Sequence, residues 1–128
     1  MKRSWPIIGV KDVAASSRFY VSLFGQSQRP PNHDDFDMIS DDDGTVLLGL
    51  HEWGGHGGGP PLLRPGKEAP GNGSLLFFRV DDFDDTLARA RSLVSRFETE
   101  PVPLDDGPGT IGFTLRDPDG YFVTVNAI

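Results

Sequence analysis

Two histidines and a glutamate stand close together in the first half of the chain, at His51, Glu52 and His56. Two imidazoles and a carboxylate could together bind a divalent metal ion. The three residues, however, run from an apolar stretch into glycines that would not fix their geometry, and adjacent strand residues point to opposite faces. We therefore predict that no metal binds here, and we keep this trio as the alternative metal site.

Most other chemistries have no starting point in the sequence. The chain has no cysteine, which excludes disulfides, thiolate zinc sites and cysteine nucleophiles. It has no Gly-x-Ser-x-Gly pattern, and the glycines of 54–59 lead into prolines rather than into a helix that could bind phosphate. We therefore predict no catalytic nucleophile, no nucleotide and no cofactor.

The chain carries a net charge of −7, from 19 acidic and 12 basic residues. This field would repel nucleic acid and attract a cationic ligand, although a charged surface that keeps the protein soluble explains it more simply. No apolar run approaches the ~20 residues of a membrane span, and the basic N-terminus does not continue into a secretory apolar segment. We expect a soluble, cytoplasmic protein that binds neither nucleic acid nor membranes.

The elements that would position a site form two similar series. In the first, an apolar run at 7–10 predicts a strand, Asp12 predicts the start of a helix that ends before Gly25, and runs at 36–39 and 45–50 predict strands around an Asp-Gly turn. In the second, runs at 75–80, 111–115 and 121–125 predict strands, 98–103 is extended, and apolar spacing from Phe83 to Phe97 predicts a helix. The Gly- and Pro-rich stretch at 54–73 predicts a linker or loop between them.

The two series align at an offset of 70 residues, which places Val10-Lys11-Asp12-Val13 over Val80-Asp81-Asp82-Phe83. A repeat of this length usually means a duplicated unit whose halves bury a shared face. We predict one α+β domain over 1–128, with a first module at about 4–53, a linker at about 54–73 and a second module at about 74–128.

Two stretches carry a family resemblance. From Ile8 to Gly25 the chain reads as a strand ending in Val-x-Asp, a helix with Ser-x-x-Phe-Tyr and a closing glycine, and Arg116 to Tyr121 reads Arg-Asp-Pro-Asp-Gly-Tyr. These stretches resemble the opening pattern and the final turn of the vicinal oxygen chelate superfamily of glyoxalases, bleomycin-resistance proteins and extradiol dioxygenases. The resemblance implies two βαβββ modules whose sheets curl around a central cleft, with the helices outside.

In metal-using members of that superfamily four strand residues, usually His, Glu, His and Glu, bind a divalent cation. The corresponding positions here are Trp5, Leu75, Thr124 and a residue at about Leu48. Tryptophan and leucine cannot bind a hard cation, and a threonine hydroxyl is a weak neutral ligand. We therefore predict that the metal site is absent.

Strand alternation then predicts an apolar cleft wall. The predicted ligand-binding residues are Trp5, Phe36, Leu48, Trp53, Leu75, Phe77, Arg79, Phe113, Phe122 and Thr124. For each of these, ordinary hydrophobic core is the competing interpretation. Arg79 needs either a ligand anion or an aspartate as its partner, and we favour an ion pair. Thr124 and Asn126 could hydrogen-bond a ligand.

The favoured function is a metal-free small-molecule binding protein that holds an apolar or aromatic ligand in the cleft between the modules, and the acidic surface could assist a cationic ligand. The resemblance to bleomycin-resistance proteins implies a homodimer. The alternative is a metal-dependent glyoxalase-like lyase, isomerase or dioxygenase with displaced ligands at His51, Glu52 and His56. A third possibility is a partner-binding module whose cleft is filled by its own Leu62 and Leu63.

Overall fold

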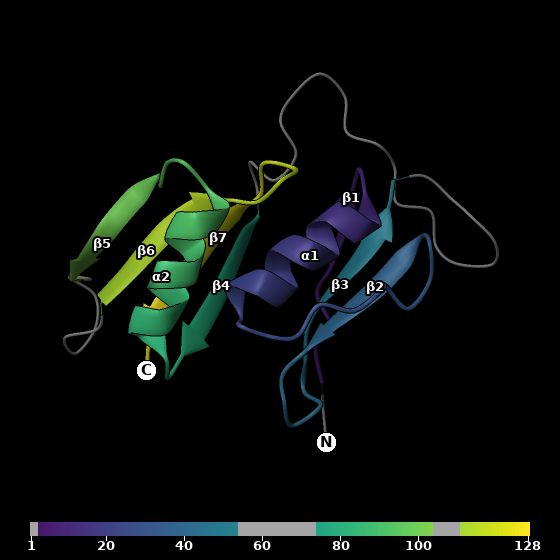
Figure 1. Cartoon of the computed structure of the whole chain (residues 1–128), viewed down its shortest axis with the longest axis horizontal. Helices are drawn as coiled ribbons and strands as arrows, with labels where there is room; N and C mark the ends of the chain where they lie inside the picture. The colour runs from purple at the N-terminus through teal and green to yellow at the C-terminus, as the bar shows by residue number, and fades with distance from the viewer. Residues whose placement is uncertain (1–2, 54–73, 104–110) are drawn as a thin grey trace.

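The computed structural model describes residues 3–53, 74–103 and 111–128, so the predicted linker, with His56, Leu62 and Leu63, lies outside the described residues. The first module contains β1 (Ile7–Val10), α1 (Val13–Leu23), β2 (Phe36–Ser40) and β3 (Val46–Glu52). The second contains β4 (Leu75–Val80), α2 (Phe83–Leu93), β5 (Thr99–Pro103), β6 (Ile111–Arg116) and β7 (Phe122–Ala127) (Figure 1). The predicted α+β fold with two related modules is confirmed.

Each module builds one sheet with the same arrangement of strands. The orders are β1-β3-β2 and β4-β7-β6-β5. In both sheets the first strand lies parallel to the last strand of its module, and the remaining pairs are antiparallel. The second module has the full predicted βαβββ order. In the first, residues 26–35 lead from α1 to β2 without a strand, so its sheet has three strands in the described part of the chain.

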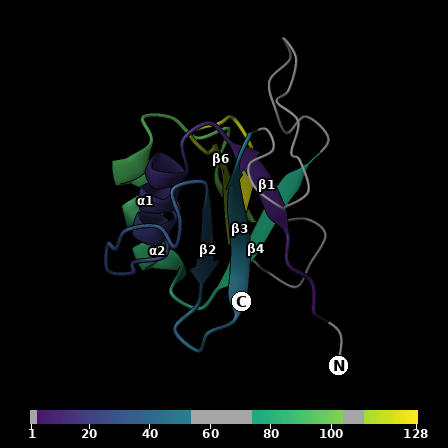
Figure 2. The same cartoon turned by 90° about the vertical axis from the view of Figure 1, so that its right-hand side faces the viewer.

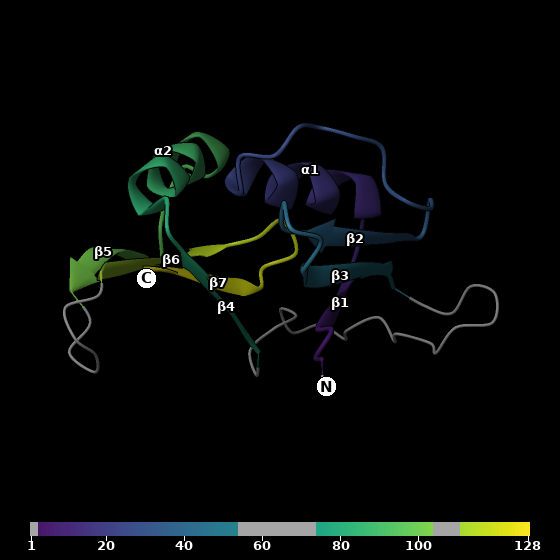
Figure 3. The same ribbon diagram turned by 90° about the horizontal axis from the view of Figure 1, so that it is seen from below.

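Both helices lie on one face of the sheets, as Figures 2 and 3 show from two directions. The core between this helix layer and the sheets contains fully buried side chains from both modules, including Tyr20, Leu23, Leu48, Leu50, Phe113, Leu115, Val123 and Val125. The opposite sheet face carries no helix in the described ranges. No helix among them is long and apolar enough to span a membrane.

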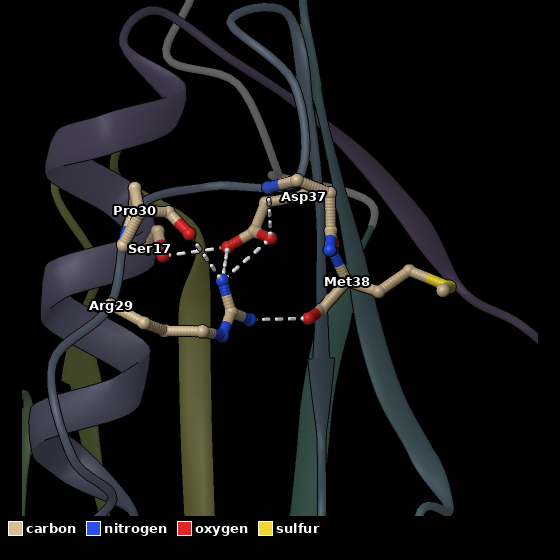
Figure 4. Close-up of polar contacts among 6 residues, drawn as sticks. Ser17, Arg29, Pro30, Asp37 and Met38 are labelled. Atoms are coloured by element: carbon tan, nitrogen blue, oxygen red, sulfur yellow. Dashed lines mark hydrogen bonds and ion pairs between the residues drawn. The ribbon is translucent and has the colours of Figure 1, made fainter.

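Side chains complete the outer edge of β2, where the second module has a fourth strand. The Met38 N–H donates to Asn32 Oδ1 over 3.0 Å, and Arg29 Nη2 donates to the Met38 carbonyl over 2.7 Å. The same guanidinium contacts both carboxylate oxygens of the fully buried Asp37, at 2.9 and 3.0 Å, and Ser17 Oγ donates to Asp37 over 2.6 Å (Figure 4). An edge strand with satisfied backbone groups is protected from pairing with other chains.

The final turn of the second module docks onto the start of α1 and holds the modules together. The Lys11 N–H donates to Asp119 Oδ1 over 2.7 Å, and Tyr20 Oη donates to Asp117 Oδ2 over 2.8 Å. Tyr121 Oη donates to the Gly9 carbonyl over 3.0 Å. The two stretches that carry the family resemblance are therefore in direct contact and link the two modules.

Burial shifts the pKa values of Tyr20, Asp117 and Tyr121 in this contact, which we call the docked corner. It raises the pKa of Tyr20 well above its ordinary value, and the neighbouring Asp117 carboxylate adds to the effect. Burial, followed by the charges of Asp117 and Asp119, raises the pKa of Tyr121 to about 12. Burial also raises the pKa of Asp117, against the lowering effect of its hydrogen bonds. The corner is a desolvated network whose hydroxyls stay protonated at neutral pH.

Candidate functional site

The strand registers decide which side chains share the open face, because residues paired across strands point to the same side of a sheet. In the first sheet Ile7 pairs with Gly49 and is exposed, whereas Ile8 pairs with Leu50 and is buried under α1. The open face of the first sheet therefore carries Ile7, Gly9, Phe36, Met38, Gly49 and His51. That of the second carries Leu75, Phe77, Arg79, Gly112, Thr114, Arg116, Phe122, Thr124 and Asn126.

A hollow of about 510 Å³ lies where the two modules meet. Its wall comes from β3, β4 and the chain that leads into β1, and its members include Ser4, Pro6, Val46, Leu47, Leu48, Leu75, Phe77 and Arg79. Two large apolar side chains of β4 are left uncovered there, since Leu75 is 58% exposed and Phe77 50% exposed. A single exposed apolar side chain is common on protein surfaces, but two neighbouring exposed apolar side chains in a concavity indicate a binding surface.

The first-module position that corresponds to Thr124 is Gly49. Thr124 pairs with Phe77, and the residue 70 positions before Phe77 is Ile7, which pairs with Gly49. The four positions from which the superfamily binds its metal are thus Trp5, Gly49, Leu75 and Thr124. This set offers one neutral hydroxyl, so these residues do not fit a divalent cation.

Two predicted ligand-binding residues lie on the helix side instead, and the prediction was wrong about their face. Leu48 pairs with Ile39 and has no exposed surface, although it is one of the residues that line the hollow. Phe113 is 1% exposed and stacks on Phe97 at 5.0 Å between ring centroids. The face predicted for Leu48 depends on an approximate position along β3, and a shift of one residue moves a side chain to the other face.

The remaining predicted residues are spread over the open face. The hollow brings together Leu75, Phe77 and Arg79. Trp5 is 57% exposed beside it. Trp53 follows β3, and its ring lies against Gly9, where a β-carbon would come within 2.1 Å of Cζ3.

Two further aromatic residues among the predictions contact other side chains of the open face. Phe36 contacts the His51 ring at 6.3 Å between centroids. The Phe122 ring is covered by the Arg116 guanidinium, which lies 3.7 Å from its centroid, so this ring is not free for a ligand. Arg116 Nη1 also donates to the Gly120 carbonyl over 2.8 Å, which holds the guanidinium in place.

The alternative metal trio is not assembled in the described part of the chain. His51 Nδ1 lies 2.6 Å from the Glu52 carbonyl oxygen. A carbonyl only accepts, so Nδ1 is the donor of this hydrogen bond. His56 lies outside the described residues, and within them no three His, Asp or Glu side chains gather closely enough to hold a metal ion.

Arg79 differs from what the sequence led us to expect. The sequence predicts an ion pair with an aspartate, yet within residues 3–53, 74–103 and 111–128 no hydrogen bond or ion pair of its side chain is present. Asp81 and Asp82 stand close behind it, where they line a second hollow of about 260 Å³ together with Asp41, Asp42 and Arg79 itself. Arg79 therefore lines both the apolar hollow and the acidic one, as Leu47 and Phe78 do.

Two polar features of the second sheet complete the open face. The hydroxyls of Thr114 and Thr124 are 2.8 Å apart, so one donates to the other and the accepting hydroxyl keeps a free proton for a ligand. Asn126 pairs with Arg79 across β4 and β7, is 4% exposed and has no hydrogen bond at Oδ1 in the described structure. Sequence reasoning missed Gly49 and Thr114, which only the strand registers reveal.

Comparisons with known proteins agree with this architecture. The family model described as Glyoxalase/Bleomycin resistance protein/Dioxygenase superfamily matches residues 3–125. Similar solved structures include a glyoxalase / bleomycin resistance protein from Catenulispora Acidiphila DSM 44928, with 19% identity, 98% of this chain and 97% of that chain covered, and a TM-score of 0.65.

Two further solved structures are similar to this chain and have other names. Oxidase ChaP-H1 has 22% identity, 100% and 96% coverage and a TM-score of 0.69. TioX from Micromonospora sp. ML1 has 14% identity, 99% and 98% coverage and a TM-score of 0.66. At these identities the structures support the fold alone. No curated protein matches the chain.

Proposed function

Because the chain belongs to the glyoxalase/bleomycin resistance protein/dioxygenase superfamily, we propose that it is a metal-free binding protein that holds an apolar or aromatic small molecule between its modules. One observation carries this proposal. The hollow between the modules exposes Leu75 and Phe77, and the four positions from which relatives bind a metal hold tryptophan, glycine, leucine and threonine.

The size and lining of the hollow suit such a ligand. Its volume of about 510 Å³ falls within the range of small-molecule sites, roughly 300 to 1,000 Å³. Covering the exposed parts of Leu75 and Phe77 supplies favourable free energy in proportion to the apolar area removed from water. Thr114 and Thr124 lie outside this lining, but Thr124 pairs with Phe77 on the same sheet face, so a ligand that extends past Phe77 would meet their hydroxyl pair as an orienting polar group.

The binding test uses 2-naphthol, a neutral aromatic probe, with the rise in melting temperature and tryptophan fluorescence as readouts. Replacing Phe77 with alanine is expected to weaken binding about tenfold, because it removes a contact worth about one to two kcal/mol. Val102→Ala is the matched control, since Val102 is 42% exposed and lies on β5, outside the lining of the hollow. Equal binding by both variants, or no binding by the unaltered protein, contradicts the proposal.

Metal analysis of the purified protein separates this function from the metal-dependent enzyme. We expect no stoichiometric divalent metal after purification, and no change in naphthol binding when a chelator is added. A tightly bound metal that is lost in His51→Ala would instead support a lyase or dioxygenase with displaced ligands.

We also propose that the chain forms a homodimer. Trp5 and Ile7 are 57% and 48% exposed, and β1 lies at the edge of its sheet with β3 as its partner. Apolar side chains on a sheet edge favour association with a second copy. Sedimentation equilibrium is expected to give a dimer that Trp5→Ser weakens, whereas a monomer at all concentrations would contradict this proposal.

A further inference from the structure

Resting on the proposed function, we propose that the ligand of this hollow carries a carboxylate that binds to Arg79 beside its aromatic part. Among the described residues that line the apolar hollow, Arg79 is the one that carries a charge. Planar guanidinium groups bind carboxylates through two parallel hydrogen bonds, which gives both affinity and orientation.

Arg79 contrasts with the other arginines for which an ion pair is seen. Side chains of Arg29, Arg89, Arg91, Arg96 and Arg116 each contact an aspartate or glutamate at 2.7 to 3.4 Å. In an acidic protein of net charge −7, an arginine beside an apolar surface without such a contact in the described structure is left available for an anion from outside.

The spacing along β4 sets the shape of the ligand. Phe77 and Arg79 are two residues apart and lie on the same face. A strand rises about 3.3 Å per residue, so their α-carbons are roughly 6 to 7 Å apart along the strand. A ring that packs on Phe77 therefore reaches the guanidinium with a carboxylate attached directly or through a short link, as in naphthoates and arylacetates.

The carboxylates behind Arg79 act against this binding. Asp41, Asp42, Asp81 and Asp82 line the acidic hollow on its other side, and none of them is in ion-pair contact with Arg79. Their charges lower the positive potential at the guanidinium without neutralising it through a hydrogen bond. Removing one of these charges should therefore strengthen carboxylate binding, which an accidental contact with the probe would not predict.

The experiment compares three probes of one shape by calorimetric titration: 2-naphthoate, 2-naphthol and 2-naphthylmethylammonium. We expect naphthoate to bind about tenfold more tightly than naphthol, as a hydrogen bond between charged groups supplies. Arg79→Met should remove this preference and leave naphthol binding within about twofold, because methionine keeps the apolar stem. Asp81→Asn should increase the affinity for naphthoate a few-fold and leave naphthol unchanged.

Arg18→Met is the matched control, since Arg18 is an exposed arginine of α1 outside the lining of both hollows. Melting curves show that each variant folds. Naphthol binding without a naphthoate preference, an equal loss of both in Arg79→Met, or tightest binding of the ammonium probe overturns the carboxylate inference and leaves the binding function standing. Failure of all three probes overturns both.

Discussion

The outer edges of the two modules solve the same problem in different ways. In the second module, backbone hydrogen bonds from β5 complete the sheet at β6. In the first, the side chains of Arg29 and Asn32 take the place of that strand at Met38, and Arg29 pairs with the buried Asp37. A duplicated unit can thus keep its sheet while one copy exchanges a strand for a small set of polar side chains.

The two modules also differ in how the turn before the last strand of each meets the other module; we call the one at 41–44 the open corner. The turns at 41–44 and 117–120 share one pattern, since residue Asp41 or Asp117 bonds to the residues three and four positions later in each. The second turn docks on Lys11 and Tyr20, but its counterpart faces the acidic Asp81 and Asp82 across a hollow of about 260 Å³. Ala90 of α2 stands where α1 has Tyr20, so the tyrosine hydroxyl that docks the second turn has no counterpart at this position. The open corner leaves Arg79 accessible.

The largest effect is expected at the edge of the first module. Asp37→Ala removes a fully buried carboxylate and leaves Arg29 and Ser17 without their shared acceptor. Breaking such a pair typically costs 3 to 5 kcal/mol, and because Arg29 stays partly exposed to water we expect about 3 kcal/mol in urea unfolding. The control at the second module's edge is Glu100→Ala, which breaks an exposed ion pair with Arg91 and should cost less than about 0.5 kcal/mol. Equal losses would show that the two edges do not differ energetically.

Alkaline titration distinguishes the docked corner from the open one. Tyr20 and Tyr121 are the two tyrosines of the chain, so tyrosinate absorbance reports on this corner alone. Their folded pKa values lie above the ordinary value of 10.0, with that of Tyr121 at about 12. Groups with raised pKa values stabilise fully below the unfolded pKa, and this stability is lost as pH rises through the folded value.

We therefore expect a melting temperature that falls between about pH 10 and pH 12, together with a folded-state absorbance change well above pH 10. The protein in urea should titrate near pH 10, which supplies the unfolded reference. A folded protein that titrates like the urea-unfolded one would show that the corner is solvated.

A smaller loss is expected from Tyr20→Phe. The substitution keeps the ring and deletes the hydroxyl that donates to Asp117, which leaves a buried carboxylate with one donor fewer. Removing one partner of a buried hydrogen bond costs about 1 to 2 kcal/mol. At the open corner Asp42→Asn alters an exposed side chain and should change stability by less than about 0.5 kcal/mol. A larger effect at Asp42 than at Tyr20 would reverse the assignment of the two corners.

Most of the fold could be predicted from local sequence patterns. The cap at Asp12 is confirmed by its acceptance of the Ala15 N–H at 2.9 Å, and the turn ahead of the last strand is confirmed at Gly120, where φ is 89°. These features depend on residues a few positions apart, which is the range in which sequence periodicity and turn chemistry are informative.

Contacts between distant residues were beyond such patterns. The bond from Tyr20 to Asp117 spans 97 positions, and neither stretch of sequence contains a pattern that indicates contact with the other. The sequence predicts Asp37 only as part of a short strand, and nothing in its surroundings indicates that Arg29 pairs with it. The prediction for Leu48 failed for the same reason. The sheet face on which Leu48 lies depends on the pairing of β3 with β2, and this register shifts between Ile39 and Ser40.

The smallest expected effect on stability is an increase rather than a loss, and it concerns two equivalent positions on the open face. His51 pairs with Gly9, which lies two positions after Ile7. Asn126 pairs with Arg79, which lies two positions after Phe77. The His51 ring bonds to the Glu52 carbonyl, whereas Asn126 Oδ1 is buried without a donor in the described structure. A buried acceptor without a partner costs stability, so Asn126→Leu, which nearly conserves the shape, should stabilise the protein by about 1 kcal/mol.

His51→Leu is the matched control and should destabilise by about 0.5 to 1 kcal/mol, because it removes a hydrogen bond that is made. Urea unfolding of the two variants measures both signs. Natural proteins keep such a stability cost mainly where a residue serves binding, so Asn126→Leu is also expected to weaken naphthoate binding next to Arg79. A more stable variant with unchanged affinity would show that Asn126 contributes nothing to the site.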